Sequence, residues 1–367
     1  MKKKLAIIGA NESIAILIER AKSLGYETHV FAWQCGDPGE KAADFFYPIS
    51  LSEKDLILEK CREIGVCGVC SITSDFAAPV VAYVSRHLGL PGNPERTDIV
   101  ARNKYEMRKA FKETGVIYCP RFFETNGGFN LEQIKDFSFP VIVKPTDRWS
   151  SKGITRVDSI ENLQEAIKIA VSESFSKKAI VEEYVEGPEY SAECIVFNGE
   201  PTVLAFTKKK TTGYPHYIET GHTQPSDIPV SKQTKIIDTI KIAIKTLGIY
   251  NSAAHAEFRI MKNGEICFME IGARMGGDFI GTDLTPISTG IDYVKMVIDV
   301  ACGKQPCFEQ VSKPSAVAVD FIMDENDIKK MALLKKDKLI RYKVYDKCFD
   351  KKIADSSSRH GFYIYKI

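Results

Sequence analysis

The stretch Ala254-His-Ala-Glu-Phe-Arg-Ile260, then Met-Lys-Asn-Gly, then Glu265-Ile-Cys-Phe-Met-Glu-Ile271 decides how the chain is interpreted. Two apolar runs are joined by an Asn-Gly pair, the strongest short-range indication of a β-hairpin. The first run carries Glu257 and the second carries Glu270. With the turn at Asn263-Gly264, the two glutamates fall at opposed positions of neighbouring strands, about 5 Å apart.

Two carboxylates this close within apolar strands repel one another unless a cation lies between them. Hard oxygen ligands beside a nucleotide favour Mg²⁺, so we predict that Glu257 and Glu270 bind magnesium. The alternative is that both are surface glutamates on a wet face of the hairpin. Arg274 follows four residues after Glu270, where it can hold a phosphoryl group by two parallel hydrogen bonds. Gly276-Gly277 would let a substrate lie against the backbone, or would form a plain turn.

Three earlier motifs suit a nucleotide. Lys144 ends an apolar strand, where its ammonium can reach a phosphate. Trp149-Ser-Ser-Lys-Gly-Ile154 offers small residues whose backbone N–H groups can approach phosphate oxygens. Val181-Glu-Glu-Tyr-Val-Glu-Gly-Pro188 ends a strand, whose backbone can meet an adenine edge and whose carboxylates can meet a ribose. Each motif alone has an ordinary alternative: a solvated lysine, a simple turn, or surface acids.

Strand and helix patterns alternate over residues 1–93, which predicts a parallel sheet with helices on both faces. The turn cluster Pro91-Gly-Asn-Pro94 marks the end of this domain. Gly9-Ala-Asn-Glu-Ser13 lacks the glycines of a dinucleotide loop and is interpreted as a scaffold turn. We expect a second domain over 94–310, with a phosphate-loop subdomain at about 120–187, and a small C-terminal α/β region over 311–367. Residues 207–230 are interpreted as an irregular segment over the cleft.

The composition is that of an ordinary globular protein. Its 367 residues carry a formal net charge of +2, too small to indicate nucleic acid or a membrane surface as partner. The first apolar run covers only Leu5 to Ile8, too short for a signal peptide or a membrane span. We therefore expect a cytoplasmic protein with reduced thiols, in which Cys67-Gly-Val-Cys70 belongs to a buried strand rather than to a zinc or redox site.

In this order the motifs resemble those of the ATP-grasp superfamily, and the chain is similar to its bacterial carboxylate–amine ligase branch, which includes L-amino acid ligases. The resemblance covers nearly the whole chain and implies an ATP-grasp fold of mixed α/β and α+β class. It implies an N-terminal Rossmann-like pre-ATP-grasp domain and a small C-terminal α/β part. The matching segments are Leu88–Asn93, Arg102–Arg108, Phe139–Pro145, Ser150–Gly153, Glu182–Glu189, and Glu257 and Glu270 with Arg274.

The resemblance also implies roles. ATP phosphates would bind Lys104, Lys144 and the loop residues Ser150, Ser151, Lys152 and Gly153; adenine would meet Glu182 with the backbone of Glu183 and Val185; and ribose would meet Glu189. Glu257 and Glu270 would hold one or two Mg²⁺ ions, with Mn²⁺ as a substitute, and Arg274 would be catalytic. Phe268 shares a strand face with Glu270 by the period of two, so we place it against adenine. Many members carry Asn as a further metal ligand where this chain has Gly272, a loss for which a bridging Glu270 or Asp278 would compensate.

The implied reaction activates a carboxylate as an acyl phosphate and joins it to an amine, giving an amide, ADP and phosphate. The alternatives are an ATP-grasp enzyme that uses bicarbonate or ribosylamine, like biotin carboxylase, carbamoyl phosphate synthase or glycinamide ribonucleotide synthetase, and an inactive nucleotide-binding module. An amino-acid-like substrate is favoured by Gly276, Gly277 and the segment Tyr214–His222, with His216 and His222 as contacts. His255 is interpreted as structural, with a ligand role left open. Partners are small-molecule carboxylates and amines, and a homodimer is left open because dimers are usual in the family.

Overall fold

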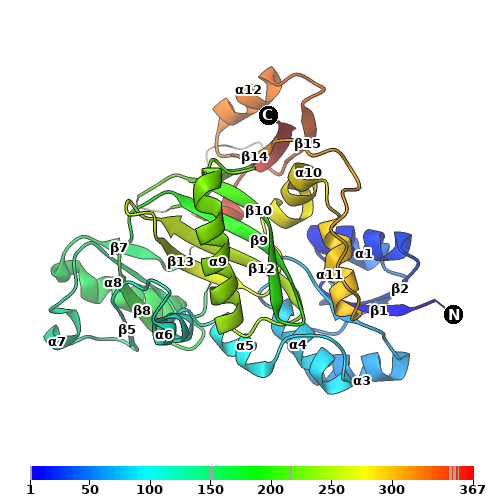
Figure 1. Ribbon diagram of the computed structural model, residues 1–367, viewed down its shortest axis with the longest axis horizontal. Helices are drawn as coiled ribbons and strands as arrows, with labels where there is room; N and C mark the ends of the chain where they lie inside the picture. The colour runs from blue at the N-terminus through cyan, green and yellow to red at the C-terminus, as the bar shows by residue number, and fades with distance from the viewer. Residues whose placement is uncertain (1, 149–151, 215–216, 347–348, 350–352, 354) are drawn as a thin grey trace.

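The computed structural model describes all residues except 1, 149–151, 215–216, 347–348, 350–352 and 354, and the described residues form three sheets with helices packed against them (Figure 1). In Figure 1 the N-terminal sheet lies on the right, the phosphate-loop sheet lies on the left, and the large central sheet lies between them. No helix of the described chain is long and apolar enough to cross a membrane.

The N-terminal sheet is parallel and is covered on both faces, as the sequence predicts. Its strand order is β3-β2-β1-β4. Leu5 and Ile7 belong to the apolar cluster with helices α1 and α11, whereas Ala6 and Ile8 belong to the cluster with α3 and α4. The elements are β1 Lys4–Ile8, α1 Glu12–Ser23, β2 Glu27–Phe31, α2 Pro38–Ala42, β3 Phe45–Tyr47, α3 Lys54–Ile64, β4 Val69–Cys70, α4 Ala77–Leu88 and α11 Tyr293–Ala301.

The phosphate-loop sheet has four antiparallel strands in the order β5-β8-β6-β7. One face packs on helix α8, where Val141, Val143 and Val181 meet Leu163 and Ile167. The elements are β5 Phe122–Thr125, α7 Leu131–Ile134, β6 Val141–Pro145, β7 Thr155–Val157, the 3₁₀ turn Ile160–Asn162, α8 Leu163–Glu173 and β8 Ala179–Glu183.

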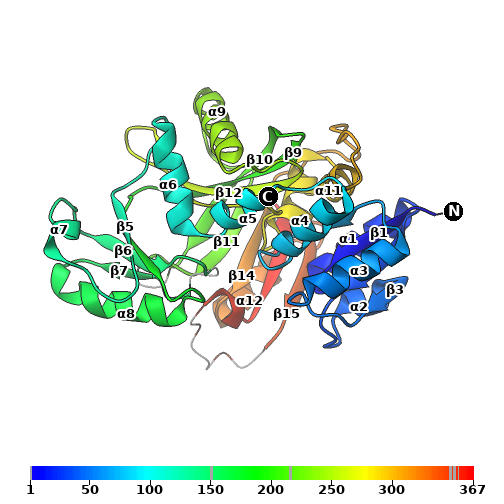
Figure 2. The same ribbon diagram turned by 90° about the horizontal axis from the view of Figure 1, so that it is seen from below.

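The central sheet has eight antiparallel strands in the order β13-β12-β9-β10-β11-β14-β16-β15. Helices α6 and α9 cover one face of β9 and β12 (Figure 2), which leaves the alternate side chains of those strands for the opposite face. The elements are α5 Glu95–Val100, α6 Lys104–Thr114, β9 Glu189–Phe197, β10 Glu200–Thr211, β11 Glu219–Gln224, α9 Val230–Thr246, β12 Ser252–Ile260, β13 Ile266–Gly272, a π-helix at Ile280–Leu284 and α10 Thr285–Thr289.

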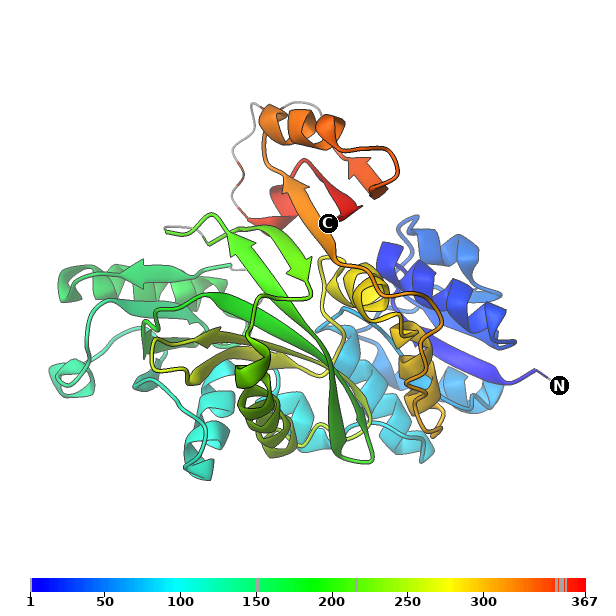
Figure 3. The same ribbon diagram turned by 45° about the horizontal axis from the view of Figure 1, so that its top comes forward.

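Two features of this sheet differ from the sequence analysis. Residues 207–230 are not wholly irregular, because β10 extends to Thr211 and β11 occupies Glu219–Gln224. The C-terminal strands continue the central sheet beyond β11 and hold α12 above it (Figure 3). Their elements are β14 Val317–Ile322, α12 Glu325–Leu333, β15 Leu339–Val344, the 3₁₀ turn Ser356–Ser358 and β16 Gly361–Lys366.

Candidate active site

A cavity of about 570 Å³ opens where the N-terminal part, the phosphate-loop sheet and the central sheet meet. Most of the described residues that the sequence analysis singled out line it: Lys104, Lys144, Lys152, Glu182, Glu183, Val185, Glu189, His222, Glu257, Glu270, Arg274 and Gly277. Ser150, Ser151 and His216 lie outside the described residues. Motifs that are separate in the sequence therefore line one cavity in the fold.

Lys144 and Glu182 form a buried ion pair between β6 and β8. Arg108, on α6, donates from its Nε to the second carboxylate oxygen at 3.0 Å. Burial opposes ionisation of Glu182, but Arg108 and Lys144 outweigh it and lower the pKa of Glu182 to about 2. Burial also lowers the pKa of Lys144, and Glu182 only partly offsets this effect. Glu182, which was predicted to meet adenine, is thus already paired with two cations. The sequence analysis did not predict Arg108 as a site residue, because only the fold brings it beside Glu182.

Lys104, on α6, and Glu270, on β13, form a second ion pair in the cavity wall. Lys104 is the first residue of α6, whose N-cap Asn103 accepts hydrogen bonds from the backbone N–H groups of Tyr105 and Glu106. The Lys104 Nζ lies 3.0 Å from a Glu270 carboxylate oxygen. The lysine predicted to bind phosphate and the glutamate predicted to bind metal are therefore neighbours.

Glu257 and Glu270 are register partners on β12 and β13, as predicted from the Asn-Gly turn. The groups around Glu257 were not predicted: its Oε1 lies 2.8 Å from Lys209 Nζ and 3.0 Å from His255 Nε2. Lys209 also lies 2.7 Å from a Glu219 oxygen. Burial lowers the pKa of Lys209, but the surrounding glutamates outweigh it and raise the pKa well above its usual range.

His255 lies fully within this network. Its ring contacts Glu193 through Nδ1 and Glu257 through Nε2. Burial lowers the pKa of His255, but the two carboxylates outweigh it and raise it to about 9. The structure supports the structural interpretation of this histidine, because it links a buried glutamate of β9 to Glu257.

Arg274 is held by an acid that belongs to the N-terminal part. Its Nε and one terminal nitrogen lie 2.9 and 3.0 Å from the two carboxylate oxygens of Asp75, which follows β4. Burial raises the pKa of Asp75, but Arg274 outweighs it and keeps the pKa below its usual value. A Cβ built on Gly272 would lie 3.1 Å from Arg274 Nε and 3.2 Å from Asp75 Oδ1. This crowding gives a reason for glycine where many family members carry Asn.

Two expectations were wrong. Phe268 does not face the cavity, because a β-bulge between Glu257 and Phe258 shifts the register at this point. Phe268 is buried against Phe111 and Phe258, and Met269 lines the cavity instead. Gly276 does not offer its backbone to a substrate either. It is buried, its N–H donates to Glu193 at 2.9 Å, and an added Cβ would lie 2.5 Å from a Glu193 oxygen.

The loop glycine Gly153 is not among the residues that line the cavity. Its φ is +70°, and an added Cβ would lie 3.0 Å from Pro145 and Glu173 side-chain atoms. Such a left-handed backbone favours glycine. The exposed Lys152 beside it lines the cavity, so this part of the loop presents a cation to the nucleotide space.

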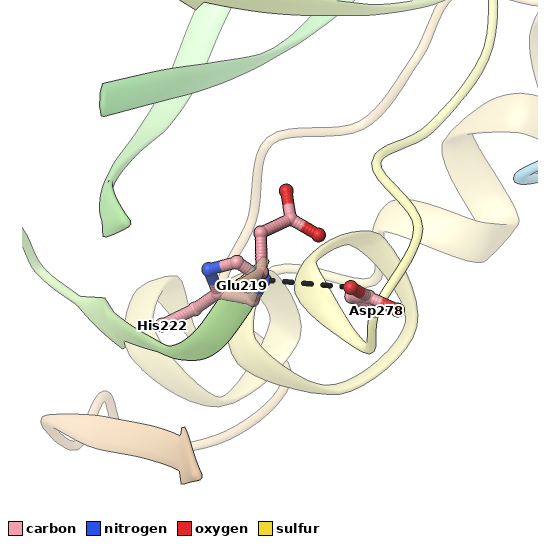
Figure 4. A group of neighbouring side chains, drawn as sticks. All are labelled: Glu219, His222 and Asp278. Carbon is pink, nitrogen blue, oxygen red and sulfur yellow. Dashed lines mark ion pairs between the residues drawn. The ribbon is translucent and has the colours of Figure 1, made fainter. Parts of the chain in front are cut away.

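Beside the Lys209–Glu257 pair, Glu219, His222 and Asp278 converge from β11 and the turn after Gly277 (Figure 4). His222 Nε2 lies 3.8 Å from an Asp278 oxygen. Among the described residues, neither ring nitrogen of this buried histidine has a hydrogen-bond partner. The guanidinium of Arg359, from the C-terminal part, donates to both Asp278 oxygens at 2.6 and 2.8 Å.

Comparison with known proteins agrees with this geometry. Residues 137–283 match the ATP-grasp domain family. The alanine–anticapsin ligase of Bacillus subtilis is 27% identical over 344 residues, 78% of this chain and 72% of that protein. Two further alanine–anticapsin ligases are matched over 61% and 62% of their own length. The D-alanine–D-alanine ligase of Aquifex aeolicus is 26% identical over 43% of this chain and 54% of that protein.

Among solved structures, an L-amino acid ligase from Bacillus licheniformis superposes with a TM-score of 0.81 at 24% identity, over 100% of this chain and 93% of that one. A phosphoribosylglycinamide synthetase from Anaerococcus prevotii gives a TM-score of 0.78 at 24% identity, over 100% and 94%. The match over residues 137–283 shows that the chain contains an ATP-grasp domain, and the fold agrees with this match. Within the ATP-grasp superfamily, three of the relatives matched over most of this chain are alanine–anticapsin ligases.

Proposed function

We propose that this protein uses ATP to activate the carboxylate of an amino acid as an acyl phosphate and then joins the acyl group to an amine, with release of ADP and phosphate. The observation that carries the proposal is the meeting of Lys104, Lys144, Glu257, Glu270 and Arg274 in one cavity. The ligase relatives support an amino acid as one substrate.

In the proposed first step, Lys104 and Lys144 hold the phosphates of ATP, and Lys152 approaches them from the loop. Each lysine already has a carboxylate neighbour, so the phosphates replace or share an existing ion pair. The substrate carboxylate attacks the γ-phosphorus, and Arg274, fixed by Asp75, stabilises the charge in transit. The rate enhancement comes mostly from positioning and electrostatics.

Glu257 and Glu270 would hold the divalent metal ion that ATP-grasp enzymes use, and we propose Mg²⁺, with Mn²⁺ as a substitute. Their opposed carboxylates suit a hard cation, and the ion would supply charge neutralisation for the phosphates when bound. Since Gly272 leaves little space for a further ligand beside Arg274, the two glutamates carry the ion or ions between them.

In the second step the amine nitrogen forms a bond to the acyl carbon as the bond from that carbon to the phosphate oxygen breaks. An ammonium substrate loses two protons on the way to an amide. One leaves with the phosphate, and His222, whose ring nitrogens are unpartnered among the described residues, takes the other. His222 is thereby the substrate contact of the segment Tyr214–His222, while Gly277 borders the acyl group.

The test is ADP release from a matrix of amino acids and amines supplied with ATP and Mg²⁺, with the amide product identified by mass spectrometry. We expect ADP and amide in equal amounts for at least one pair. ADP formed with bicarbonate alone would favour a carboxylase-like reaction, and binding of ATP without turnover on any pair would favour a nucleotide-binding module.

We further propose the domain limits given by the sequence, 1–93, 94–310 and 311–367, a cytoplasmic location, and a homodimer. Limited proteolysis should cut near the proposed limits. Light scattering should give twice the 41.0 kDa chain mass. A single-chain mass at micromolar concentration would contradict the dimer.

A further inference from the structure

Two cysteine thiols from different parts of the chain are neighbours in the fold. The Sγ atoms of Cys67 and Cys302 lie 3.9 Å apart, although 235 positions separate the two residues in the sequence. Cys67 precedes strand β4 of the N-terminal sheet, and Cys302 caps the C-terminal end of helix α11. Neither residue lines the nucleotide cavity, so the proposed reaction gives this pair of thiols no role.

This contact changes the interpretation of Cys67-Gly-Val-Cys70, which the sequence analysis assigned to a buried strand. That assignment is confirmed for Cys70, which lies in β4 and is buried. It is wrong for Cys67, which lies outside the strand and is partly exposed, as Cys302 also is. The thiol that contacts Cys67 thus comes from the end of α11, and small molecules in solution can reach the pair.

Gly68 is the residue that lets the two thiols approach. A Cβ added there would lie 2.8 Å from Cys302 Sγ and 2.8 Å from the backbone oxygen of Ala301, closer than real Cβ atoms come. Helix α11 is itself fixed, because Val297 and Ile298 are buried in the apolar cluster that includes strand β1. The packing of α11 on the N-terminal sheet therefore keeps the two thiols side by side.

The two thiols differ in acidity. The hydrogen bond from Cys302 lowers the pKa of Cys67 to about 6; burial opposes this effect, and Lys3 and Lys304 add to it. The same hydrogen bond, together with burial, raises the pKa of Cys302, so this thiol keeps its proton. The thiolate is the attacking form in thiol–disulfide exchange. Cys67 is therefore the nucleophile of the pair.

We propose that Cys67 and Cys302 form a reversible disulfide that ties the N-terminal sheet to helix α11. The oxidant is a small disulfide, such as oxidised glutathione. The Cys67 thiolate attacks one sulfur of that disulfide, which releases one thiolate and leaves a mixed disulfide on Cys67. Cys302 then loses its proton and attacks the Cys67 sulfur, which forms the bond between the two cysteines and releases the second thiolate. The cysteines give up two electrons and two protons, and the small disulfide becomes two thiols.

The link needs only a small movement. A disulfide bond is about 2.05 Å long, so the two sulfur atoms must approach by about 2 Å, to which rotation of both side chains contributes. The link encloses the phosphate-loop sheet and strands β9 to β13, which lie between the two cysteines in the sequence. Closing so long a loop restricts the unfolded chain, so the oxidised protein should be the more stable form.

The test equilibrates the reduced full chain with glutathione buffers of increasing oxidised fraction, followed by alkylation and peptide mapping by mass spectrometry. We expect a linked Cys67–Cys302 peptide that dithiothreitol removes. The oxidised protein should melt at least ~3 °C above the reduced protein. Cys302→Ser should lose this rise in melting temperature. Cys307→Ser, at an exposed cysteine close to Cys302 in the sequence, is the matched control and should keep the rise.

Three outcomes would overturn the inference: a link from Cys67 to Cys70, glutathione on Cys67 of the wild type without a link to Cys302, or fully reduced thiols at both positions in the most oxidising buffer. Peptide mapping of the wild type decides among them, so a Cys302→Ser protein that fails to fold leaves the test intact. No measurement here uses turnover, so a failure of this inference leaves the proposed function standing.

Discussion

At the scale of single residues, the site is a set of buried charges that already neutralise one another. Lys104 pairs with Glu270, Lys144 with Glu182, and Arg274 with Asp75. Burying a charge is costly unless it is paired, and removal of one partner leaves the other exposed to that cost. Substitutions here therefore need a stability measurement beside the activity measurement.

Glu270 gives the first prediction. Glu270→Gln keeps the volume but removes the charge that faces Glu257 and Lys104, so turnover should fall by at least ~10²-fold. ADP release measures turnover, and thermal melting checks that the fold persists. Glu265→Gln, at the exposed hairpin turn, is the matched control and should be close to wild type. Near-normal ADP formation by Glu270→Gln would contradict the proposal that Glu270 binds the metal ion.

The second prediction compares Arg274 with Lys144. We propose that Arg274 acts on the phosphoryl group in transit, so Arg274→Met should lower kcat by at least ~10²-fold and leave the affinity for a non-hydrolysable ATP analogue within a few-fold. Lys144→Met should weaken binding of the analogue directly. Calorimetry beside steady-state kinetics makes the comparison. If the two variants bind the analogue equally poorly, Arg274 is a nucleotide-binding residue.

His255 gives a pH dependence. Its pKa is raised from 6.5 to about 9 by Glu193 and Glu257 against the effect of burial, so the folded state binds the proton more tightly than the unfolded state. The stabilisation is complete below pH 6.5 and is lost as the pH rises through 9. It amounts to something on the order of 3 kcal/mol. Urea unfolding from pH 6 to pH 10 should show this loss in the wild type, and His255→Asn should lack it.

At the scale of elements, the β12–β13 hairpin decides which of its side chains reach the cavity. The strands next to the turn pair one residue away from the register expected of the Asn-Gly turn, with Phe258 opposite Phe268. The bulge, in which Met269 is the extra residue, restores the Glu257–Glu270 pair and leaves Phe268 in the core and Met269 at the cavity. A bulge inserts one residue into a strand and reverses the faces beyond it. The prediction from the period of two, that Phe268 shares a face with Glu270, was therefore wrong, whereas the predicted pairing of Glu257 with Glu270 is confirmed.

This yields a paired prediction. Phe268→Ala removes a buried ring and should lower the free energy of unfolding by about 3–5 kcal/mol. Met269→Ala should leave stability within about 1 kcal/mol, as is usual for partly exposed sites, but should weaken binding of the ATP analogue. Denaturant unfolding and calorimetry measure the two quantities. The reverse pattern would mean that Phe268, not Met269, meets the nucleotide.

At the scale of the whole molecule, the site is complete only where three parts of the chain meet. The phosphate-loop sheet brings Lys144, the central sheet brings Glu257 and Glu270, and the N-terminal part brings Asp75, 199 residues before Arg274. The N-terminal part is thus more than a scaffold, because its Asp75 fixes the direction of Arg274, the arginine that we propose as catalytic.

Asp75→Asn tests that connection. The amide keeps the shape but loses the charge that holds Arg274, so kcat should fall at least ~10-fold. The affinity for the ATP analogue should stay within twofold. Glu59→Gln, exposed on α3 of the same part, is the control. An unchanged kcat in folded Asp75→Asn would show that Arg274 keeps its position without Asp75.

The sequence by itself determined what is local: the Asn-Gly hairpin with its two opposed glutamates, the parallel N-terminal sheet, and the order of the nucleotide motifs. Turn chemistry and side-chain periodicity act over a few residues, so they can be followed along the chain. The tertiary structure alone decided the partners of the buried charges, such as Arg108, Lys209 and Asp75, and the cavity bounded by Arg359. Those contacts join residues far apart in the chain, and they depend on how packed elements meet rather than on any local preference.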